Sequence, residues 1–306
     1  MTRLARQSFL GTDSDRILRG ATVGLVGLGG GGSHIGQQFA HAGVGGYVLV
    51  DPQEIDETNT NRLIGGTLTD VRDGTLKTVI TARLIRGLMP DARIQEYNTS
   101  WHDATDALKA CDLIMGCLDT FSEREQLERF ARRYLIPYID IGMDVHETSK
   151  GRFLVAGQIV RSCPGEPCLR CCGIVTDERL RREAEAYGAA GGRPQVVWPN
   201  GVLASTAVGL AIQMLTPWFQ PGRGFSYLEY DGNRSTVRES ARMQHLKGRT
   251  CPHHPPTDTG DPWFDLREFM KPQAPVHLDK TPWPISVLEF IRGQFRRCTA
   301  IFTRRG

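Results

Sequence analysis

The chain has 306 residues, of which 40% are hydrophobic and 23% charged, so it is long enough to bury a large core and has the composition of a globular protein. Its 37 basic and 34 acidic residues give a net charge of +3, which provides no general field for attracting nucleic acid or an anionic membrane. The longest apolar run, Gly201 to Leu215, is shorter than the roughly 20 residues that span a bilayer, and the N-terminus lacks the apolar core of a signal peptide. We therefore expect a cytoplasmic protein with no membrane or nucleic-acid partner.

Strand-like and helix-like segments alternate through the first half of the chain. The expected strands are residues 21–27, 46–50, 111–118, 136–141 and 151–160, and the expected helices are 33–42, 76–89 and 121–134. The alternation predicts an α/β fold with a doubly wound, Rossmann-like and mostly parallel sheet that binds ligands at the carboxyl ends of its strands.

The second half of the chain does not continue this alternation. A Cys/Pro/Gly-rich segment at 162–173 is followed by a charged stretch at 176–194, which we interpret as a surface helix and a loop. An apolar core helix at 201–215 and a final strand pair at 225–230 and 235–238 complete the predicted elements.

A glycine-rich segment, residues 27–32, joins the first expected strand to the first expected helix. Gly27, Gly29 and Gly32 satisfy the G-x-G-x-x-G spacing, with Gly30 between them, and Asp51 ends the next strand about 20 residues later. Glycine lets the backbone approach phosphates, while an acid at this distance binds ribose hydroxyls. The pattern predicts a nucleotide site, but it does not separate hydride transfer from phosphate chemistry.

Residues downstream of Asp51 favour phosphate chemistry. Asn59, Arg62 and Lys77 follow it, and Asp119 comes after the next long strand. Either cation alone would be read as a solvated surface charge, but two cations and an amide suit a triphosphate, whose negative charges they neutralise. Asp119 would hold magnesium, because this cation prefers carboxylate and phosphate oxygens.

With these residues together, the sequence resembles the ThiF/MoeB adenylyltransferases and the adenylation domain of ubiquitin-activating enzymes. The matching segments are RLARQ (3–7), VGLGGGGS (26–33), AGVGGYVLVD (42–51), TNTNR (58–62), the lysine of DGTLK (73–77) and CLD (117–119). The resemblance implies that Asp51 binds the ribose of ATP, that Asn59, Arg62 and Lys77 contact its phosphates, and that Asp119 holds magnesium. It also implies a homodimer, because Arg6 would reach the phosphates from the opposite subunit.

The reaction implied by the resemblance is adenylation of the C-terminal glycine carboxylate of a small ubiquitin-like or sulfur-carrier protein. The carboxylate attacks the α-phosphorus of ATP, and pyrophosphate leaves. No general base is needed, so catalysis comes from alignment and from charge stabilisation by Arg6, Arg62, Lys77 and magnesium. A conjugating or sulfur-transfer protein is a candidate downstream partner. The alternatives are an NAD-dependent Rossmann oxidoreductase and a non-catalytic scaffold of the same fold.

Two cysteine-containing pairs predict a structural zinc site. Cys168 and Cys171 form a C-x-x-C knuckle, and Cys251 and His254 form a second pair some eighty residues later. The family commonly places zinc here on four cysteines, so the histidine is a departure, and His253 is the alternative fourth ligand. The competing interpretation is two unrelated groups of reduced thiols.

This assignment sets the domain boundaries that we expect. Residues 1–254 form the adenylation domain with its zinc-knuckle insertion, and residues 255–306 form a linker and a short C-terminal extension. Within the extension, 283–295 has an amphipathic pattern with a basic end, interpreted as a helix packed on the main domain or as a docking segment for a carrier.

No cysteine is assigned a catalytic role. Some members of the family carry an acyl-accepting cysteine before the last core helix, but residues 174–200 contain none in this chain. Cys172 and Cys298 are the weaker candidates, while Cys111 and Cys117 are expected to be inert in a core strand.

Overall fold

The computed structural model describes residues 3–149, 151–185, 194–219, 224–255 and 259. The chain divides into one compact unit, Met1–Thr259, and a second unit, Gly260–Gly306. The predicted pattern at 283–295 and Cys298 lie outside the described residues, as does much of the loop predicted before the apolar helix.

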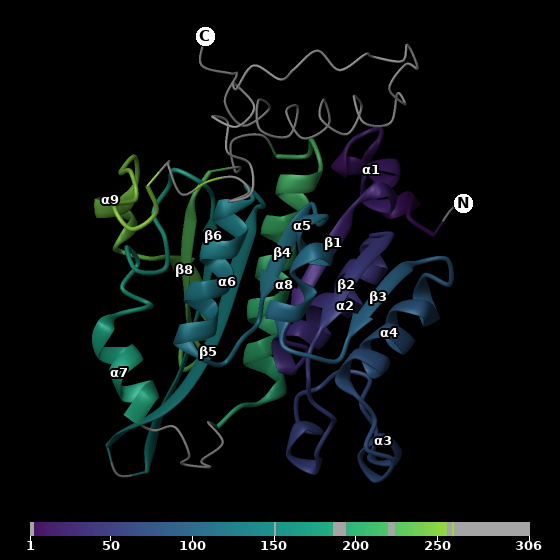
Figure 1. Cartoon of the computed structure of the whole chain (residues 1–306), viewed down its shortest axis with the longest axis horizontal. Coiled ribbons are helices and arrows are strands. Elements are labelled where there is room, and N and C mark those ends of the chain that lie inside the picture. The colour runs from purple at the N-terminus through teal and green to yellow at the C-terminus, as the bar shows by residue number, and fades with distance from the viewer. Residues whose placement is uncertain (1–2, 150, 186–193, 220–223, 256–258, 260–306) are drawn as a thin grey trace, which may run out of the picture. The chain divides into compact units, whose positions relative to one another are not determined.

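An eight-stranded sheet with the order β3-β2-β1-β4-β5-β6-β7-β8 forms the centre of the first unit (Figure 1). The strands are β1 (Thr22–Val26), β2 (Gly46–Val50), β3 (Arg93–Tyr97), β4 (Leu113–Gly116), β5 (Tyr138–Ser149), β6 (Arg152–Ser162), β7 (Ser226–Asp231) and β8 (Thr236–Glu239). Strands β1 to β5 are parallel, and β6 to β8 extend the sheet in antiparallel fashion. The expected doubly wound, mostly parallel α/β fold is therefore confirmed.

Helices cover both faces of this sheet. They are α1 (Ser14–Gly20), α2 (Gly30–Ala42), α3 (Leu68–Arg72), α4 (Lys77–Leu88), α5 (Thr105–Lys109), α6 (Phe121–Arg133), α7 (Asp177–Glu185), α8 (Val197–Leu215) and α9 (Met243–Leu246). Short 3-10 helices occupy η1 (Ala5–Leu10), η2 (Glu57–Asn59) and η3 (Trp101–Ala104). Helix α2 packs against α4 and α8 on one face, and α6 packs against β4 and β5 on the other (Figure 1).

The period-2 alternation of strand side chains produces two hydrophobic cores. In β4, Leu113 and Met115 point to the core beneath α2 and α8, whereas Ile114 points to the core beneath α6. Because both faces are covered, all four residues of β4 are buried, as its nearly continuous apolar sequence indicated.

Several boundaries differ from those expected. Helix α2 begins at Gly30, because the glycines already adopt the first helical turn, and α8 begins at Val197, because proline is tolerated in a first turn, where Pro199 lies. Strand β4 ends at Gly116, which leaves residues 117–119 in a loop. Strand β3 was not among the expected strands, because its segment, RIQEY, lies at the sheet edge and mixes charged with apolar residues.

No helix in the described part of the chain is both long and apolar enough to span a bilayer. This includes α8, whose buried face contributes to the core beneath α2.

Candidate functional site

The register of three neighbouring strands brings the predicted site residues to one edge of the sheet. Val26 of β1 pairs with Val50 of β2 on one side and with Gly116 of β4 on the other. The residues that follow each strand therefore emerge side by side, namely the glycine loop, Asp51 and the loop that contains Asp119. Carboxyl ends of parallel strands are where open α/β sheets bind ligands.

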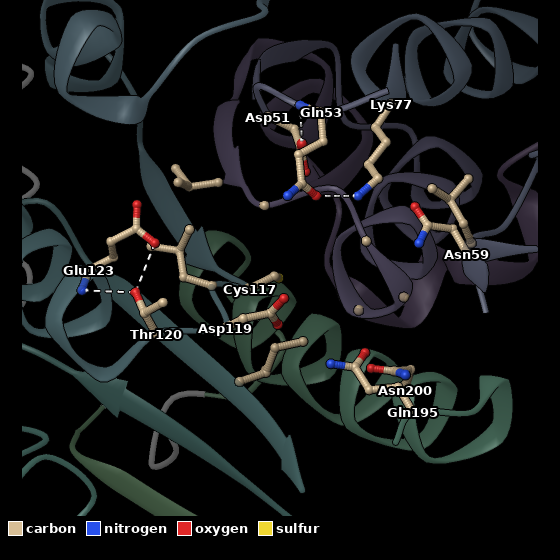
Figure 2. A pocket seen from close by; sticks show the side chains of 18 of the residues that line it. Asp51, Gln53, Asn59, Lys77, Cys117, Asp119, Thr120, Glu123, Gln195 and Asn200 are labelled. Atoms are coloured by element: carbon tan, nitrogen blue, oxygen red, sulfur yellow. Dashed lines mark hydrogen bonds between the residues drawn. The ribbon is translucent and has the colours of Figure 1, made fainter. Parts of the chain in front are cut away.

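A cavity of 570 Å³ opens at this edge. Its lining includes Gly27, Gly29, Gly30, Asp51, Gln53, Asn59, Arg62, Lys77, Asp119, Thr120, Arg124, Gln195 and Asn200. Figure 2 shows Asp51, Gln53 and Lys77 on one wall, with Asp119 and Thr120 across from them. The volume is in the range that holds a nucleotide-sized ligand.

The glycines of the loop serve two different purposes. Gly27 has a positive φ of 87°, and a Cβ there would lie 2.5 Å from the carbonyl oxygen of Cys117. At Gly29 a Cβ would meet nothing within 4 Å, so this position leaves the cavity open to a ligand. Gly32, which was expected to bind the cofactor, does not line the cavity; its Cβ would lie 1.9 Å from the carbonyl oxygen of Gly27, so glycine is needed there for packing.

Asp51 is only 6% exposed and is held by the backbone around it. Its Oδ2 accepts a hydrogen bond from the Leu28 amide at 2.7 Å, and its Oδ1 accepts one from the Gln53 amide at 2.9 Å. Each carboxylate oxygen keeps a further lone pair that can accept from a hydroxyl. Asp51 therefore fixes the shape of the glycine loop and can still bind ribose.

Asn59 and Arg62 are presented by η2 and the turn after it. Asn59 is buried and forms a capping box with Asp56, in which each side chain binds the other residue's backbone amide. The Nη1 atom of Arg62 donates to the carbonyl oxygen of Thr58 at 2.6 Å and to Oδ1 of Asn61 at 3.0 Å. Both acceptors are uncharged, so the guanidinium keeps its full charge for an anion.

Lys77 is the first residue of α4 and is 6% exposed. Its Nζ donates to Oε1 of Gln53 at 2.6 Å, and Figure 2 shows both side chains at the cavity wall. Lys77 has no ion pair with any described residue. A buried ammonium held by a neutral amide is an arrangement suited to binding an anionic ligand.

Asp119 is exposed in the loop between β4 and α6 and lines the cavity opposite Lys77. The next residue, Thr120, caps α6 by accepting from the Glu123 amide at 3.3 Å, and its hydroxyl donates to the Glu123 side chain at 2.8 Å. The cap fixes the start of the helix, and with it the backbone from which the Asp119 side chain extends.

A buried ion pair lies beneath this side of the cavity. Arg124 of α6 donates to both oxygens of Asp140 at 3.0 and 2.5 Å, and the Tyr138 hydroxyl donates to the same carboxylate at 3.0 Å. Burial lowers the pKa of Arg124, but the charge and hydrogen bonds of Asp140 act in the opposite direction. The net result is a raised pKa, so Arg124 stays charged.

Arg6 is exposed on η1 and does not line the cavity of its own chain. The helix η1 is joined to the end of β1 that lies away from the cavity, with α1 between them (Figure 1). Arg6 is therefore not among the residues that could bind a ligand in the cavity of its own chain, and the role expected for this residue stays a prediction.

Three thiols and one imidazole meet at the cysteine-rich segment. The Cys168 and Cys171 sulfurs are 3.7 Å apart, the Cys171 and Cys251 sulfurs 3.8 Å apart, and Nδ1 of His253 lies 3.4 Å from both Cys168 and Cys171. A tetrahedral zinc ion with Zn–S bonds of about 2.3 Å requires sulfur–sulfur distances of about 3.8 Å. The donors and their spacing fit zinc.

His254, the fourth ligand favoured in the sequence analysis, faces another group. Its Nε2 lies 4.0 Å from Oε2 of Glu128, while His253 approaches all three thiols. Glu128 also accepts from the Leu169 amide at 3.1 Å and from the Ser162 hydroxyl at 2.6 Å. The geometry thus favours His253, the alternative left open by the sequence, because it groups with all three thiols, whereas His254 groups with Cys168 and Glu128.

The remaining described cysteines are poor nucleophiles. Burial raises the pKa of Cys111 and of Cys163 to about 12, and it raises the pKa of Cys117 and Cys172 as well. Since the thiolate is the reactive form, these residues are protonated at neutral pH. Cys172, one of the two weaker candidates for an acyl acceptor, therefore lacks the environment of a reactive thiol.

Gln53 and the Arg124–Asp140 pair were not among the expected site residues. A glutamine two residues after Asp51 carries no pattern of its own, and its role depends on where the Lys77 side chain points. The ion pair did leave a signal, because Asp140 is a lone charge in the apolar run IPYIDIG, and a charge in a buried strand requires a partner.

Comparison with known proteins places this site in a family. The model of the ThiF family matches residues 1–253. The molybdopterin-synthase adenylyltransferase of Escherichia coli is 29% identical over 259 residues, which cover 82% of this chain and 96% of that protein. Protein HesA, heterocyst, of Trichormus variabilis is 28% identical over 260 residues, covering 82% of this chain and 88% of that protein.

Two further similarities extend the comparison. Ubiquitin-like modifier-activating enzyme 5 of Drosophila persimilis is 26% identical over 187 residues, covering 54% of this chain and 46% of that protein. The crystal structure of Escherichia coli MccB with ATP matches with a TM-score of 0.63 at 19% identity, over 78% of this chain and 71% of that one, which shows a shared fold. From the match over residues 1–253, the chain belongs to the ThiF family.

Proposed function

We propose that this protein uses ATP and magnesium to adenylate the C-terminal carboxylate of a small ubiquitin-like or sulfur-carrier protein. The observation that carries the proposal is the cavity in which the glycine loop, Asp51, Asn59, Arg62, Lys77 and Asp119 converge. This set offers a ribose acceptor, backbone amides and cations for phosphates, and a carboxylate for a metal. Hydride transfer by NAD would leave Lys77 and Asp119 without a task.

The chemistry needs positioning more than proton transfer. A carboxylate oxygen of the carrier attacks the α-phosphorus, the bond from that phosphorus to the bridging oxygen breaks, and pyrophosphate leaves with both electrons of that bond. Arg62 and Lys77 stabilise negative charge on the phosphates, and Asp51 holds the ribose so that the reacting atoms are aligned. Magnesium, held by Asp119, would neutralise charge on the phosphate oxygens.

The class of acceptor is supported by the relatives. One is named an adenylyltransferase of molybdopterin synthase and another an activating enzyme of a ubiquitin-like modifier. We infer from these relatives that the acceptor here is a small protein that ends in glycine, since a residue without a side chain can enter a cavity that a nucleotide already occupies. A conjugating or sulfur-transfer protein would then take the activated acyl group.

We further propose a homodimer in which Arg6 of one subunit completes the site of the other. Its exposure on η1 and its absence from the cavity of its own chain support this arrangement. Mixing Arg6→Ala with Asp119→Ala tests it, because random pairing gives heterodimers with one intact site and about a quarter of wild-type activity. Activity that stays at the level of the separate variants would contradict the shared site.

The thiol cluster is proposed to hold one structural zinc ion through Cys168, Cys171, Cys251 and His253. With four protein ligands the ion would have no open position, so its role is to fold the knuckle and not to bind substrate. Reduced thiols are required for this, which favours a cytoplasmic location.

The direct test of the activity is exchange of labelled pyrophosphate into ATP, with and without a small glycine-ended protein. We expect exchange that depends on the carrier and falls by about 100-fold or more in Asp119→Ala. Glu178→Ala, at an exposed position of α7, is the control and should exchange at the wild-type rate. Titration with ATP–magnesium and with NAD separates the proposal from the oxidoreductase alternative, which would require tighter binding of NAD.

A further inference from the structure

Gln53 is hydrogen-bonded to two residues of the proposed ATP site, Asp51 and Lys77. Its backbone amide donates to Oδ1 of Asp51 at 2.9 Å, and its carbonyl oxygen accepts from the Lys77 amide at 3.0 Å. Its side-chain Oε1 accepts from the Lys77 ammonium at 2.6 Å. One residue thus fixes the backbone and the side chain of the lysine relative to the ribose-binding acid.

The position of Lys77 is unfavourable for a cation without such a partner. The residue is the first of α4, where the helix dipole is positive, and only 6% of it is exposed to water. A buried ammonium needs hydrogen-bond acceptors to replace water, and Gln53 supplies a short one. Without it, the flexible lysine side chain would lose the interaction that points it along the cavity wall.

A carboxylate at position 53 would hold the lysine more strongly but would also cancel its charge. A glutamine oxygen orients the ammonium without forming an ion pair with it, so that its charge stays available to a phosphate. Because an ammonium has no lone pair, the glutamine must present its oxygen to it, and its Nε2 then faces away from Lys77, as Figure 2 shows.

We infer that Gln53 is a positioning residue that sets both the direction and the available charge of Lys77 for the phosphates of ATP. This inference rests on the proposed function for its ligand, and it concerns how the site is built. It predicts that changing position 53 alters ATP binding through Lys77 and through no other group.

The experiment is a calorimetric titration of ATP–magnesium into the full-length protein and a set of variants. We expect Gln53→Ala and Gln53→Glu each to weaken binding by about tenfold to a hundredfold, because a charge-assisted hydrogen bond or an uncompensated charge is lost. In a Lys77→Met background, the same two substitutions should cause little further loss. This coupling is the readout that a merely structural role of Gln53 would not produce.

The matched control is Gln195→Glu, which adds the same negative charge to the lining of the same cavity without contacting Lys77. We expect it to weaken ATP binding clearly less than Gln53→Glu. Equal losses in the two variants, or equal losses from Gln53→Ala with and without Lys77, would overturn the inference. If the wild-type protein binds no ATP, it is the proposed function that fails, which keeps the two outcomes distinct.

Discussion

Lys77 and Arg62, which line the cavity, donate to uncharged oxygens and have no ion pair with a described residue, whereas two buried arginines of α6 lie beside carboxylates. Arg124, which also borders the cavity, donates to Asp140, and Arg132 forms an ion pair with Glu128 at 3.5 Å. The first pair keeps its positive charge available to a ligand. In the second pair, Asp140 neutralises Arg124 inside the fold, and Arg132 is held by Glu128 together with the Ser162 hydroxyl and the Pro167 carbonyl. Basic side chains therefore have two roles in this molecule. A cation without a carboxylate partner can bind an anionic ligand, and a buried cation with a carboxylate partner stabilises the fold.

The largest expected effect concerns the buried pair beneath the cavity. Asp140→Asn should lower the free energy of unfolding by about 3–5 kcal/mol, because it leaves the Arg124 guanidinium buried without a counter-charge. Chemical denaturation measures this. The double variant Arg124→Met/Asp140→Leu should be more stable than Asp140→Asn alone, and the comparison breaks if removal of both partners costs at least as much as removal of one.

Lys77→Met should affect ligand binding and not stability, the opposite of Asp140→Asn. We expect it to weaken ATP binding by about a hundredfold while leaving the free energy of unfolding of the ligand-free protein unchanged or higher, because a buried charge with no carboxylate partner is removed. Calorimetry and denaturation of the same sample give both quantities. A large loss of stability would mean that Lys77 belongs with the structural cations.

The zinc knuckle provides a smaller and more local contrast. His253→Ala should reduce zinc affinity by about tenfold or more and lower the midpoint of thermal unfolding, since its Nδ1 lies within 3.4 Å of two thiols. His254→Ala is the matched control next to it and should have the lesser effect. Metal content per chain and competition with a chelator measure both; the reverse order would restore His254 as the ligand.

The smallest effect is expected at an exposed pair of α7. Arg182 and Glu178 form an ion pair one helical turn apart, with side chains 74% and 63% exposed. Arg182→Ala should change the free energy of unfolding by no more than about 0.5 kcal/mol, and the difference should disappear in high salt. A small change would show that a carboxylate partner stabilises the fold only when the pair is buried, and a larger change would show that burial is not required.

The parts of the fold that the sequence predicted depend on local patterns. Strand β2 was found with its observed bounds, and the glycine spacing placed the loop between β1 and α2, because apolar runs and glycine requirements are both set by neighbouring residues. Strand β3 was missed, since an edge strand with charges needs its neighbour before its pattern has meaning.

The parts of the site that sequence could not supply depend on the direction of side chains. Gln53 and Lys77 are 24 positions apart, and Arg124 and Asp140 are 16 apart, so no spacing rule connects them. The choice between His253 and His254 likewise depends on which imidazole lies near all three thiols and which lies near only Cys168 and Glu128. Motifs identified which residue types meet, while packing determined which atoms touch.

The central claim is that this cavity binds ATP with its ribose at Asp51 and its phosphates between the glycine loop and Lys77. A crystal structure of the protein grown with ATP and magnesium tests this most directly. We predict a nucleotide whose ribose hydroxyl lies within hydrogen-bond distance of the Asp51 carboxylate, with phosphate oxygens on the Lys77 and Arg62 cations. Nucleotide bound elsewhere, or bound here without contact to Asp51 and Lys77, would contradict the account.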